Sequence, residues 1–424
     1  MSLTERLEEI REGFERPFWV ANVSEIFERL SYYGAFSSLA VYLQEKLNFS
    51  TEQTGTLTGI FGGMVWFLAI FGGAVADKLG FRRALSMAYL ILASAYFLIG
   101  SIGASWLAPV RGAVPLSVLV VCILILPALG IALVKPSVVG TTARASQANV
   151  RTLGYSIYYT MVNIGGTAGP FVADWAHTHF GLERVFRISA LSVFAMFFLI
   201  LFFFRDPRKP GDEPAPSLLQ VGRNFRAVIW PPRFLIFLLI FTGYWIVFWQ
   251  QYTSLPGFIH TYVNAKARVE LILITDALIV VCFTFIVNYL ARKLPPFHAV
   301  ILGTVISSMS WLVLSFWPTV AGAVASIAVL AIGEIIQQPP YYAYISRLAP
   351  PGQQGTYMGF AFLPIGIGSL VGGWFGGTMM HHFGEVAHHP GRAWWVISAV
   401  GFTTALLLWI YDRAVKPAAQ QPSS

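Results

Sequence analysis

Twelve segments of the chain are apolar over about 20 positions, the length that an α-helix needs to cross a bilayer. They follow one another through all 424 residues, separated by short polar stretches. The pattern therefore predicts an all-α membrane protein with twelve transmembrane helices. The expected spans are 18–43, 53–76, 83–103, 115–140, 152–177, 185–205, 233–262, 267–291, 296–316, 319–348, 354–382 and 391–414.

The most polar stretch, Arg205–Pro232, separates the sixth segment from the seventh. It contains six prolines together with several Arg and Lys residues, which is typical of a linker. We expect an N-terminal six-helix bundle over 1–205 and a cytoplasmic linker over 206–232. A C-terminal six-helix bundle with a short cytoplasmic tail is expected over 233–424.

Composition and charge agree with this interpretation. The chain is 56% hydrophobic and only 11% charged, whereas soluble domains carry about 25% charged residues. Nineteen of the 28 Lys and Arg residues fall on the side that holds the N-terminus and seven on the other side. The positive-inside rule then places both termini in the cytoplasm. We expect a multi-pass protein of a bacterial-type inner (plasma) membrane, and the net charge of +8 reflects this topology rather than nucleic-acid binding.

Charged residues interrupt the first apolar segment. Glu25, Glu28, Arg29 and Tyr32 are spaced i, i+3, i+4 and i+7, so they share one helix face. A charge near the bilayer centre costs at least about 2.5–3.5 kcal/mol, and such groups persist only when paired or turned toward a watery cavity. We favour a functional cluster. The alternative is a buried packing network without a transport role.

Three more ionisable residues lie within apolar segments. Lys135 precedes Pro136 and needs an acidic partner unless it snorkels to an interface. Glu334 has no interface nearby in the sequence. Asp276 fits either an acid in a cavity or a residue at a helix end.

The two halves of the chain repeat one another. Five pairs of residues match at a constant offset of 203 positions, which suggests duplication. Parallel six-helix halves with a substrate site between them are the architecture of the major facilitator superfamily. The matched pairs are Gly130 and Gly333, Pro136 and Pro339, Arg144 and Arg347, Gly165 and Gly368, and Gly169 and Gly372.

The loop after the second span agrees with that architecture. The run Gly73-x3-Asp77-Lys78-Leu79-Gly80-Phe81-Arg82-Arg83 resembles the superfamily signature G-x3-D-[RK]-x-G-R-[RK]. The resemblance implies that Asp77, Arg82 and Arg83 form a conformational loop on the cytoplasmic side.

The first span resembles a narrower family. Glu25-x-x-Glu28-Arg29-x-x-Tyr32-Tyr33-Gly34 is similar to the E-x-x-E-R-F-x-Y-Y-G signature of the proton-dependent oligopeptide transporters. Further segments resemble the same family in order along the chain. These are Gly130 to Ser137 with the Lys135-Pro136 pair, Gly154 to Gly165 with Asn163, Phe248 to Ser254, Gly333-Glu334 with Pro339, Leu348 to Pro350, and Met358-Gly359.

The resemblance assigns roles to particular residues. It implies that Glu25, Glu28, Arg29 and Lys135 couple transport to protons, and that Glu334 faces the cavity from the other half. We expect the substrate site to draw on both halves of the chain. Its candidates are Tyr32, Tyr33, Phe36, Lys135, Tyr158, Asn163, Trp249, Gln250, Gln251 and Glu334.

The chain also departs from that family. Bacterial members commonly carry two additional helices between the halves, and the 206–232 linker has no apolar run long enough for them. The family's first-helix arginine, implicated in holding a peptide's carboxylate, is Phe36 here. Its seventh-helix glutamate, which can pair with that arginine, is Gln250. A family asparagine of the eighth helix aligns weakly with Asp276.

The resemblance implies a proton-coupled symporter that imports small peptides or peptide-like solutes by alternating access. A proton-antiport exporter of drugs or metabolites on the same fold is the main alternative, and a receptor or scaffold without transport is a third. Without a nucleophile–base constellation or a phosphate-binding loop in the sequence, we expect neither an enzyme nor an ATP-driven pump. We expect no cofactor beyond coupling protons, and a monomer whose partners are its substrate and the lipid bilayer.

Two cysteines within apolar segments indicate neither a disulfide framework nor a metal cluster. Runs of histidine at the outer helix ends fit either a metal site or a polar loop, and we expect the loop. The histidines are His177, His179, His381, His382, His388 and His389.

Overall fold

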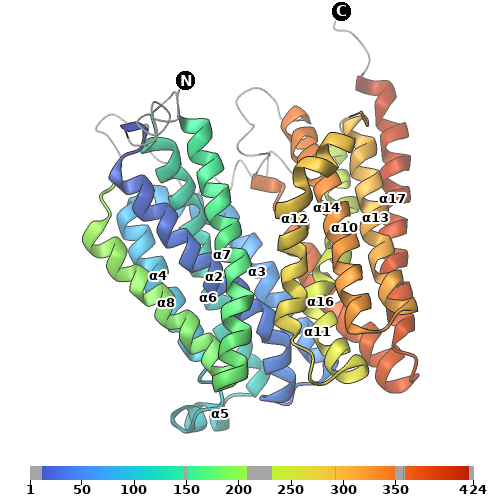
Figure 1. Ribbon diagram of the computed structural model, residues 1–424, viewed down its shortest axis with the longest axis horizontal. Helices are drawn as coiled ribbons and strands as arrows, with labels where there is room; N and C mark the ends of the chain where they lie inside the picture. The colour runs from blue at the N-terminus through green and yellow to red at the C-terminus, as the bar shows by residue number, and fades with distance from the viewer. Residues whose placement is uncertain are drawn as a thin grey trace, which may run out of the picture. The chain divides into compact units, whose positions relative to one another are not determined.

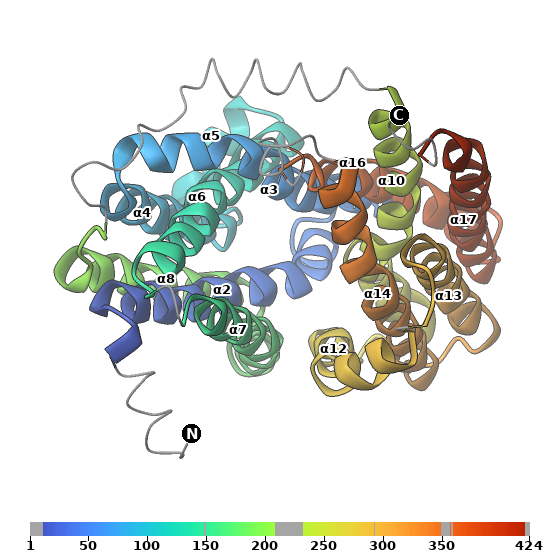
Figure 2. The same cartoon turned by 90° about the horizontal axis from the view of Figure 1, so that it is seen from above.

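A computed structural model describes residues 12–147, 150–207, 232–291, 293–348, 357 and 359–419. The described residues are almost entirely helical, and the β-structure among them is a single bridge between Phe14 and Ser146. Figures 1 and 2 show the helices in two perpendicular views. The predicted linker over 206–232 falls largely outside the described residues, so the predicted domain boundaries stay a prediction.

Six long helices come from the first part of the chain. A short 3-10 turn, η1 (Ser105–Leu107), and the short helix α5 (Ala108–Ala113) connect the third of them to the fourth. The long helices are α2 (Arg16–Glu45), α3 (Thr51–Leu79), α4 (Phe81–Ile99), α6 (Leu116–Arg144), α7 (Arg151–Phe180) and α8 (Leu182–Phe203).

Six more long helices follow residue 231. Short irregular turns extend two of them: α11 (Leu255–Phe258) with η2 (Ile259–Val263) after the first, and η3 (His381–Val386) after the fifth. The long helices are α10 (Pro232–Thr253), α12 (Val269–Ala291), α13 (Pro296–Phe316), α14 (Val320–Leu348), α16 (Leu363–Met380) and α17 (Gly391–Ala419).

The predicted fold class is confirmed. Among the described residues, eight helices are long and apolar enough to cross a membrane: α3, α4, α6, α8, α10, α13, α14 and α17. The other four long helices, α2, α7, α12 and α16, complete the predicted order of twelve. One predicted span, 233–262, is divided in the structure, because α10 ends at Thr253 and a proline stands in the first turn of α11.

The chain divides into two compact units. The first unit comprises residues 1–42 and 64–222, and the second comprises residues 43–63 and 223–424. In the first unit, α4 packs against α6 and α8, and α7 also contacts both of these helices. In the second, α13 packs against α14 and α17, α10 against α16 and α17, and α12 against α14 (Figure 2).

Glycines let α2 and α7 approach closely within the first unit. A Cβ atom added at Gly169 would lie 2.5 Å from the carbonyl oxygen of Leu30 and 2.9 Å from the amide nitrogen of Gly34. Small residues at such crossings allow backbone-to-backbone packing in membranes, where helices gain little from the hydrophobic effect. The glycines therefore fix where α7 lies against the face of α2 that follows Arg29.

The second unit uses the same device between residues 51–63 of α3 and α16. A Cβ atom at Gly59 would lie 2.6 Å from the carbonyl oxygen of Ser369 and 3.0 Å from Cα of Gly373. Ser369 also donates a hydrogen bond of 3.2 Å to the carbonyl of Gly59. The contact leaves no room for a side chain at position 59.

We predict that Gly59→Val lowers the thermal stability of the purified protein. Forcing extra methyl groups into a closely packed contact costs typically about 1–3 kcal/mol. Gly103→Val is the matched control, because a Cβ atom at Gly103 meets nothing within 4 Å. Thermal melts in detergent measure both variants, and equal melting midpoints for them would contradict the close approach at Gly59.

Candidate functional site

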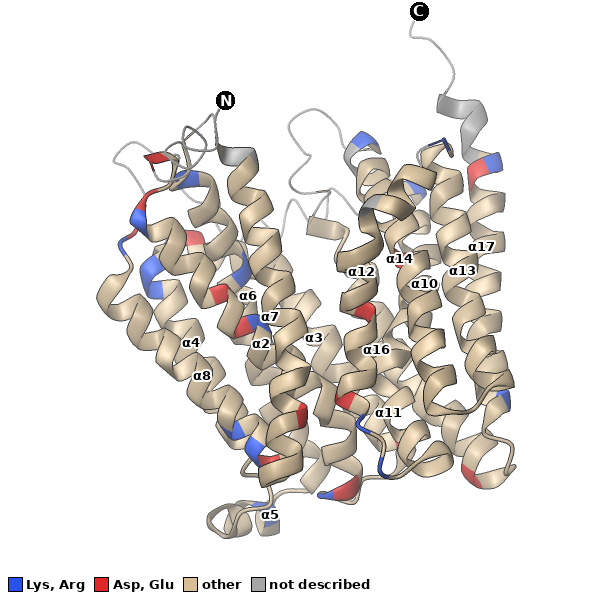
Figure 3. Cartoon of the chain, in the orientation of Figure 1, with Lys and Arg blue, Asp and Glu red and all other residues tan. Residues whose placement is uncertain are grey.

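Most charged residues lie near the ends of the helices, and a few lie in their middle (Figure 3). Three of these interior charges form a cluster on α2. Glu25 and Glu28 are fully buried, and Arg29 is 2% exposed. The Nε atom of Arg29 lies 3.5 Å from Oε1 of Glu25 and also pairs with Glu28. The spacing predicted from the sequence therefore brings two carboxylates to one guanidinium.

The cluster leaves polar atoms without hydrogen-bond partners. Among the described residues, neither carboxylate oxygen of Glu25 has such a partner, and Oε1 of Glu28 and Nη2 of Arg29 also lack one. A buried polar atom without a partner costs about 1–3 kcal/mol, and more when it is charged. The arrangement can thus take up a proton or a ligand group at its carboxylates.

Lys135 on α6 is the second cation near this cluster. Its ammonium group lies 3.8 Å from the centroid of the Trp66 ring on α3, a cation–π geometry. It is also within electrostatic range of Glu25, Glu28 and Arg29. The structure therefore brings the four predicted proton-coupling residues together, and it adds Trp66, which the sequence analysis did not select.

Two tyrosines on α4 also face the cluster and were missed. Tyr89 lies within electrostatic range of Glu25, and Tyr96 within range of Glu28 and Arg29. Both side chains are fully buried, and their hydroxyls have no hydrogen-bond partner among the described residues. Their spacing of seven residues, which places them on one helix face, is the signal that would have found them.

The aromatic candidates of α2 continue from the charge cluster. The ring of Tyr32 packs below the guanidinium of Arg29 at 5.1 Å and meets the ring of Tyr33 at 5.1 Å. Phe36 is buried and lies 5.7 Å from Tyr32 between ring centroids. These three rings thus form a continuous row with Arg29 on the same helix.

Of the two candidates on α7, Tyr158 lies close to the same cluster. Tyr158 is half-buried and within electrostatic range of Glu25 and Arg29. Asn163 donates a hydrogen bond of 2.8 Å to the carbonyl of Tyr159 in its own helix. A Cβ atom at Gly165 would lie 2.7 Å from Cβ of Arg29, so this glycine lets α7 reach the cluster.

In the second unit, Trp249 and Gln250 connect α10 to α16. The indole of Trp249 donates to the carbonyl of Ile365 at 3.0 Å, and the amide of Gln250 donates to Gly372 at 2.9 Å. The side-chain oxygen of Gln250 accepts a bond of 2.6 Å from Ser254. Gln250 is fully buried, so its amide is used in helix–helix contacts, and its binding of substrate stays a prediction.

Gln251 and Glu334 differ from Gln250 in their hydrogen bonding. Gln251 is fully buried, and both polar atoms of its amide lack hydrogen-bond partners among the described residues. Glu334 on α14 is half-buried; one oxygen accepts a bond of 2.9 Å from Gln338 and the other has no partner there. Asp276 lies within electrostatic range of Glu334 from α12, two turns inside that helix, so it is no helix-end residue.

The predicted conformational loop forms a tight turn in the first unit. Gly80 separates α3 from α4 with a φ of +88°, a conformation that suits glycine. Arg82 donates to the carbonyl of Leu201 at 2.7 Å, in the last turn of α8, where a cation is favourable. Arg83 is exposed and Asp77 half-buried, and a conformational role for the loop stays a prediction.

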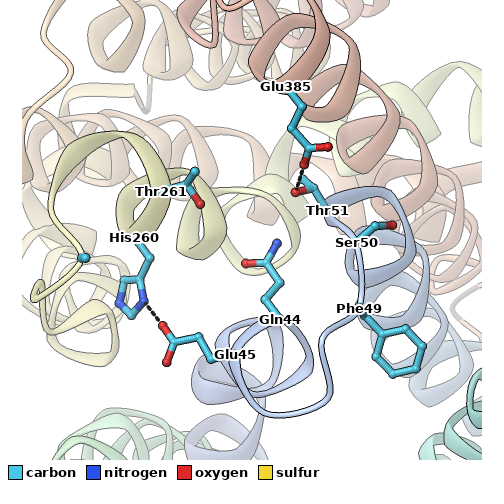
Figure 4. A pocket seen from close by; sticks show the side chains of 9 residues that line it. Gln44, Glu45, Phe49, Ser50, Thr51, His260, Thr261 and Glu385 are labelled. Carbon is cyan, nitrogen blue, oxygen red and sulfur yellow. Dashed lines mark hydrogen bonds and ion pairs between the residues drawn. The ribbon is translucent and has the colours of Figure 1, made fainter.

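An open pocket of about 360 Å³ lies at helix ends in the second unit. Figure 4 shows His260 facing Glu45 and Thr51 facing Glu385 at its rim. The Nδ1 atom of His260 lies 2.8 Å from Glu45, whose side chain is 47% exposed. These polar contacts are exposed to solvent and are worth little energy, so this pocket is a poor candidate for a proton or substrate site.

The histidine runs make local contacts at helix ends. His381 lies 2.6 Å from Glu385 one turn away, and His179 lies 2.8 Å from the carbonyl of Trp175. In the part of the chain that the structure describes, no group of three or more His, Cys, Asp or Glu residues could hold a metal ion. His177 and His179 lie in the last turn of α7, and His381 and His382 lie in η3, so these four residues are in helix ends rather than in loops.

The sequence model described as Major Facilitator Superfamily matches residues 23–363 and 267–424. The chain belongs to the major facilitator superfamily. Membership makes it a multi-pass membrane transporter and not an enzyme.

Solved structures share its fold. A POT family transporter in complex with 5-aminolevulinic acid superimposes with a TM-score of 0.76 at 14% identity, covering 94% of this chain and 96% of that one. A second, with a thioalcohol-conjugated peptide, gives 0.78 at 13% identity over 96% and 97%. A peptide transporter POT with alafosfalin gives 0.74 at 17% identity over 94% of each chain. The expected fold likeness to peptide transporters is confirmed.

Curated relatives carry another name. The multidrug resistance protein MdtH of Salmonella typhimurium is 22% identical over 390 residues, which is 92% of each chain. The protein of that name from Salmonella newport matches to the same extent. Structural and sequence neighbours thus carry different functional names, and the functional choice depends on the site.

We predict that Arg29→Met strongly destabilises the protein. Removing one partner of a buried ion pair costs about 3–5 kcal/mol, because the other charge stays buried. The double variant Glu28→Gln/Arg29→Met removes one of the stranded charges and should recover part of the loss. Arg83→Met, at an exposed position in the first turn of α4, is the control, and thermal melts compare the four proteins. If Arg29→Met is as stable as the wild type, a structural ion pair at Arg29 is excluded.

Proposed function

We propose that the protein is a proton-coupled symporter that imports small peptides or peptide-like solutes by alternating access. The observation that carries the proposal is the buried cluster in which Glu25 and Glu28 share Arg29 while Lys135 lies nearby. Two acids and two bases in a low-dielectric interior form a network whose pairing changes when one proton binds.

In this mechanism, protonation of one glutamate releases the basic group that it held. Lys135 or Arg29 then pairs with the remaining carboxylate of the network. A ligand or proton shifts a conformational equilibrium only through its different affinity for the two states. The changed pairing supplies that difference, so one access state is favoured over the other.

The substrate class is supported by the fold likeness to POT transporters solved with a conjugated peptide, alafosfalin and 5-aminolevulinic acid. We assign substrate contacts to residues from both units. In the first unit they are Tyr32, Tyr33, Phe36, Lys135, Tyr158 and Asn163, and in the second Trp249, Gln250, Gln251 and Glu334. Glu334 is proposed to hold a positively charged group such as an α-amine.

A proton-antiport exporter of drugs or metabolites is the second candidate. It is supported by the relatives named multidrug resistance protein MdtH, whose similarity extends over 92% of this chain. The same charge network suits either direction, because it couples protons to the access state and not to a particular cargo. The two candidates differ in the response to an imposed inward proton gradient, which drives accumulation in a symporter and extrusion in an exporter.

The proposal also covers membrane topology, oligomeric state and coupling ion. Both termini are placed in the cytoplasm of a bacterial-type inner membrane, supported by the asymmetric distribution of Lys and Arg. The transporter is proposed to act as a monomer, with protons as the coupling ion and no bound cofactor.

We predict that Glu28→Gln and Lys135→Ala each abolish proton-driven accumulation in proteoliposomes and leave some counterflow of substrate. Each removes one member of the network that senses the proton, whereas counterflow needs only the substrate to cross. Glu45→Gln, at an exposed helix end, is the control and should accumulate substrate normally. Gradient-driven uptake at the wild-type rate in both variants would refute coupling through this cluster.

We also predict weak discrimination between a dipeptide and its C-terminal amide. The position of the family's carboxylate-holding arginine is the buried Phe36, so no cation stands there to prefer the free acid. Competition binding of a dipeptide and its amide measures the ratio of their affinities. A preference for the free acid of a hundredfold or more, about 2.7 kcal/mol, would mean that another group clamps the carboxylate.

A further inference from the structure

Two arginines come together at one end of the first unit, outside the charge cluster on α2. Arg111 on α5 and Arg187 near the start of α8 are both half-buried. Each lies within electrostatic range of the hydroxyl of Tyr42, near the end of α2. Tyr42 lies about 20 Å further along α2 than Arg29, at 1.5 Å per residue. Figure 3 shows basic residues in blue on α5 and at one end of α8.

Close helix packing fixes the backbone on which Arg187 stands. The hydroxyl of Tyr42 donates a hydrogen bond of 2.8 Å to the carbonyl of Ile99, the last residue of α4. A Cβ atom at Gly100 would lie 2.6 Å from the carbonyl oxygen of Glu183 and 3.3 Å from Cγ of Arg187. The beginning of α8 is therefore held against the end of α4, next to the end of α2.

The described chain does not balance the positive charge of this pair. Glu183 is the acid within range of the same tyrosine, and among the described residues it forms no ion pair with either arginine. Nη2 of Arg111 donates to the carbonyl of Ala104 at 3.1 Å. The Nε atoms of Arg111 and Arg187 are buried and have no hydrogen-bond partner among the described residues. Buried donors are normally paired, so the two guanidinium groups are only partly satisfied by the protein.

Exposed apolar side chains adjoin the arginines. Trp106 in η1 and Phe97 on α4 are both exposed, and their rings stack with 6.2 Å between centroids. Val110, which precedes Arg111 in α5, is exposed as well. In membrane proteins, Trp is enriched at the level of the lipid headgroups, where one side of the ring is apolar and the other is wet. This end of the unit thus presents a cationic and an apolar surface together.

We propose that Arg111 and Arg187 bind the phosphate of an anionic phospholipid, whose acyl chains lie against Phe97 and Trp106. Guanidinium groups match the geometry of phosphate oxygens and form charge-assisted hydrogen bonds with them. Two arginines against the single Glu183 leave one positive charge uncompensated, which favours phosphatidylglycerol over a zwitterionic lipid. On the proposed topology the lipid belongs to the outer leaflet.

The bound phosphate joins α5 to α8, two elements that are not adjacent in the sequence. It therefore stabilises the connection between α4 and α6 at the membrane surface. The site lies apart from the residues to which proton coupling and cargo binding are assigned, so it does not depend on the proposed function.

The test uses the purified full-length protein in dodecyl maltoside and a phosphatidylglycerol with a fluorescent label on one acyl chain, whose binding is measured by anisotropy. The competitors are phosphatidylglycerol, phosphatidylcholine and glycerol phosphate, which offers a phosphate without acyl chains. We expect phosphatidylglycerol to compete at least about tenfold better than phosphatidylcholine. Glycerol phosphate should compete at least about a hundredfold more weakly than phosphatidylglycerol, because it buries no apolar surface.

Arg111→Gln and Arg187→Gln should each weaken phosphatidylglycerol binding about tenfold or more, since each removes charge-assisted hydrogen bonds. Trp106→Ala should weaken binding of both phospholipids by the same factor, because the acyl chains are common to them. The matched control is Lys266→Gln/Arg392→Gln, which removes two exposed basic residues of the second unit and should bind as the wild type does.

If a glutamine variant fails to fold, Arg111→Lys and Arg187→Lys keep the charge but lose the planar fork. They should weaken binding by a smaller factor and retain the preference for phosphatidylglycerol. Wild-type affinity in the glutamine variants, or in both lysine variants where the glutamine variants do not fold, overturns the site.

The competitors and the control test the identity of the ligand. Equal competition by phosphatidylcholine overturns the preference for an anionic lipid. Glycerol phosphate competing as well as phosphatidylglycerol shows a site for a soluble anion and overturns the lipid assignment. A loss of binding in the control as large as in the arginine variants shows attraction to overall charge and overturns the assignment to Arg111 and Arg187.

Discussion

A carboxylate that leaves water for the interior of a membrane protein must find a positive partner or a proton. Both units of this transporter depend on that constraint, and each meets it differently. In the first, Glu25 and Glu28 share Arg29, with Lys135 close enough to exchange partners. In the second, Asp276 lies on α12 and Glu334 on α14, and Arg347, the one Lys, Arg or His residue that the structure describes on these two helices, lies in the last turn of α14.

Helix packing explains why the charges can lie where they do. Glycines at helix crossings let α7 lie directly on α2 and residues 51–63 of α3 on α16. Side-chain amides and indoles, such as those of Gln250 and Trp249, then add hydrogen bonds between helices. Close backbone packing leaves little space for water, which keeps the environment of the buried ions one of low dielectric constant and makes their pairing energetically decisive.

The sequence was sufficient for the helices and for the charge cluster on α2. Length and hydrophobicity determine transmembrane helices almost locally, and a charge within an apolar run is conspicuous without any structure. The tyrosines of α4 were missed, because Tyr89 and Tyr96 are ordinary aromatic residues until α4 is seen to pack beside Glu25 and Glu28.

The sequence also could not predict which buried amides have hydrogen-bond partners. The neighbouring glutamines Gln250 and Gln251 look equivalent in the sequence. One is fully engaged by α16 and Ser254, and the other has no partner among the described residues. The ambiguity over Asp276 could likewise be resolved only by finding which helix faces it, since the position of an acid along a helix does not reveal its neighbours.

The backbone contact between α2 and α7 has a mechanical consequence. Flexible side chains between two helices absorb small displacements, but at Gly34, Gly165 and Gly169 the facing atoms are mainly backbone atoms, together with the Cβ atoms of Arg29 and Ala173. The two helices should therefore move as one stiff body, with the glutamates of α2 and Tyr158 of α7 held in fixed register. A change in ionisation on α2 should then displace the aromatic and amide groups of α7 as well. The glycine contacts act as the rigid connection between the two helices.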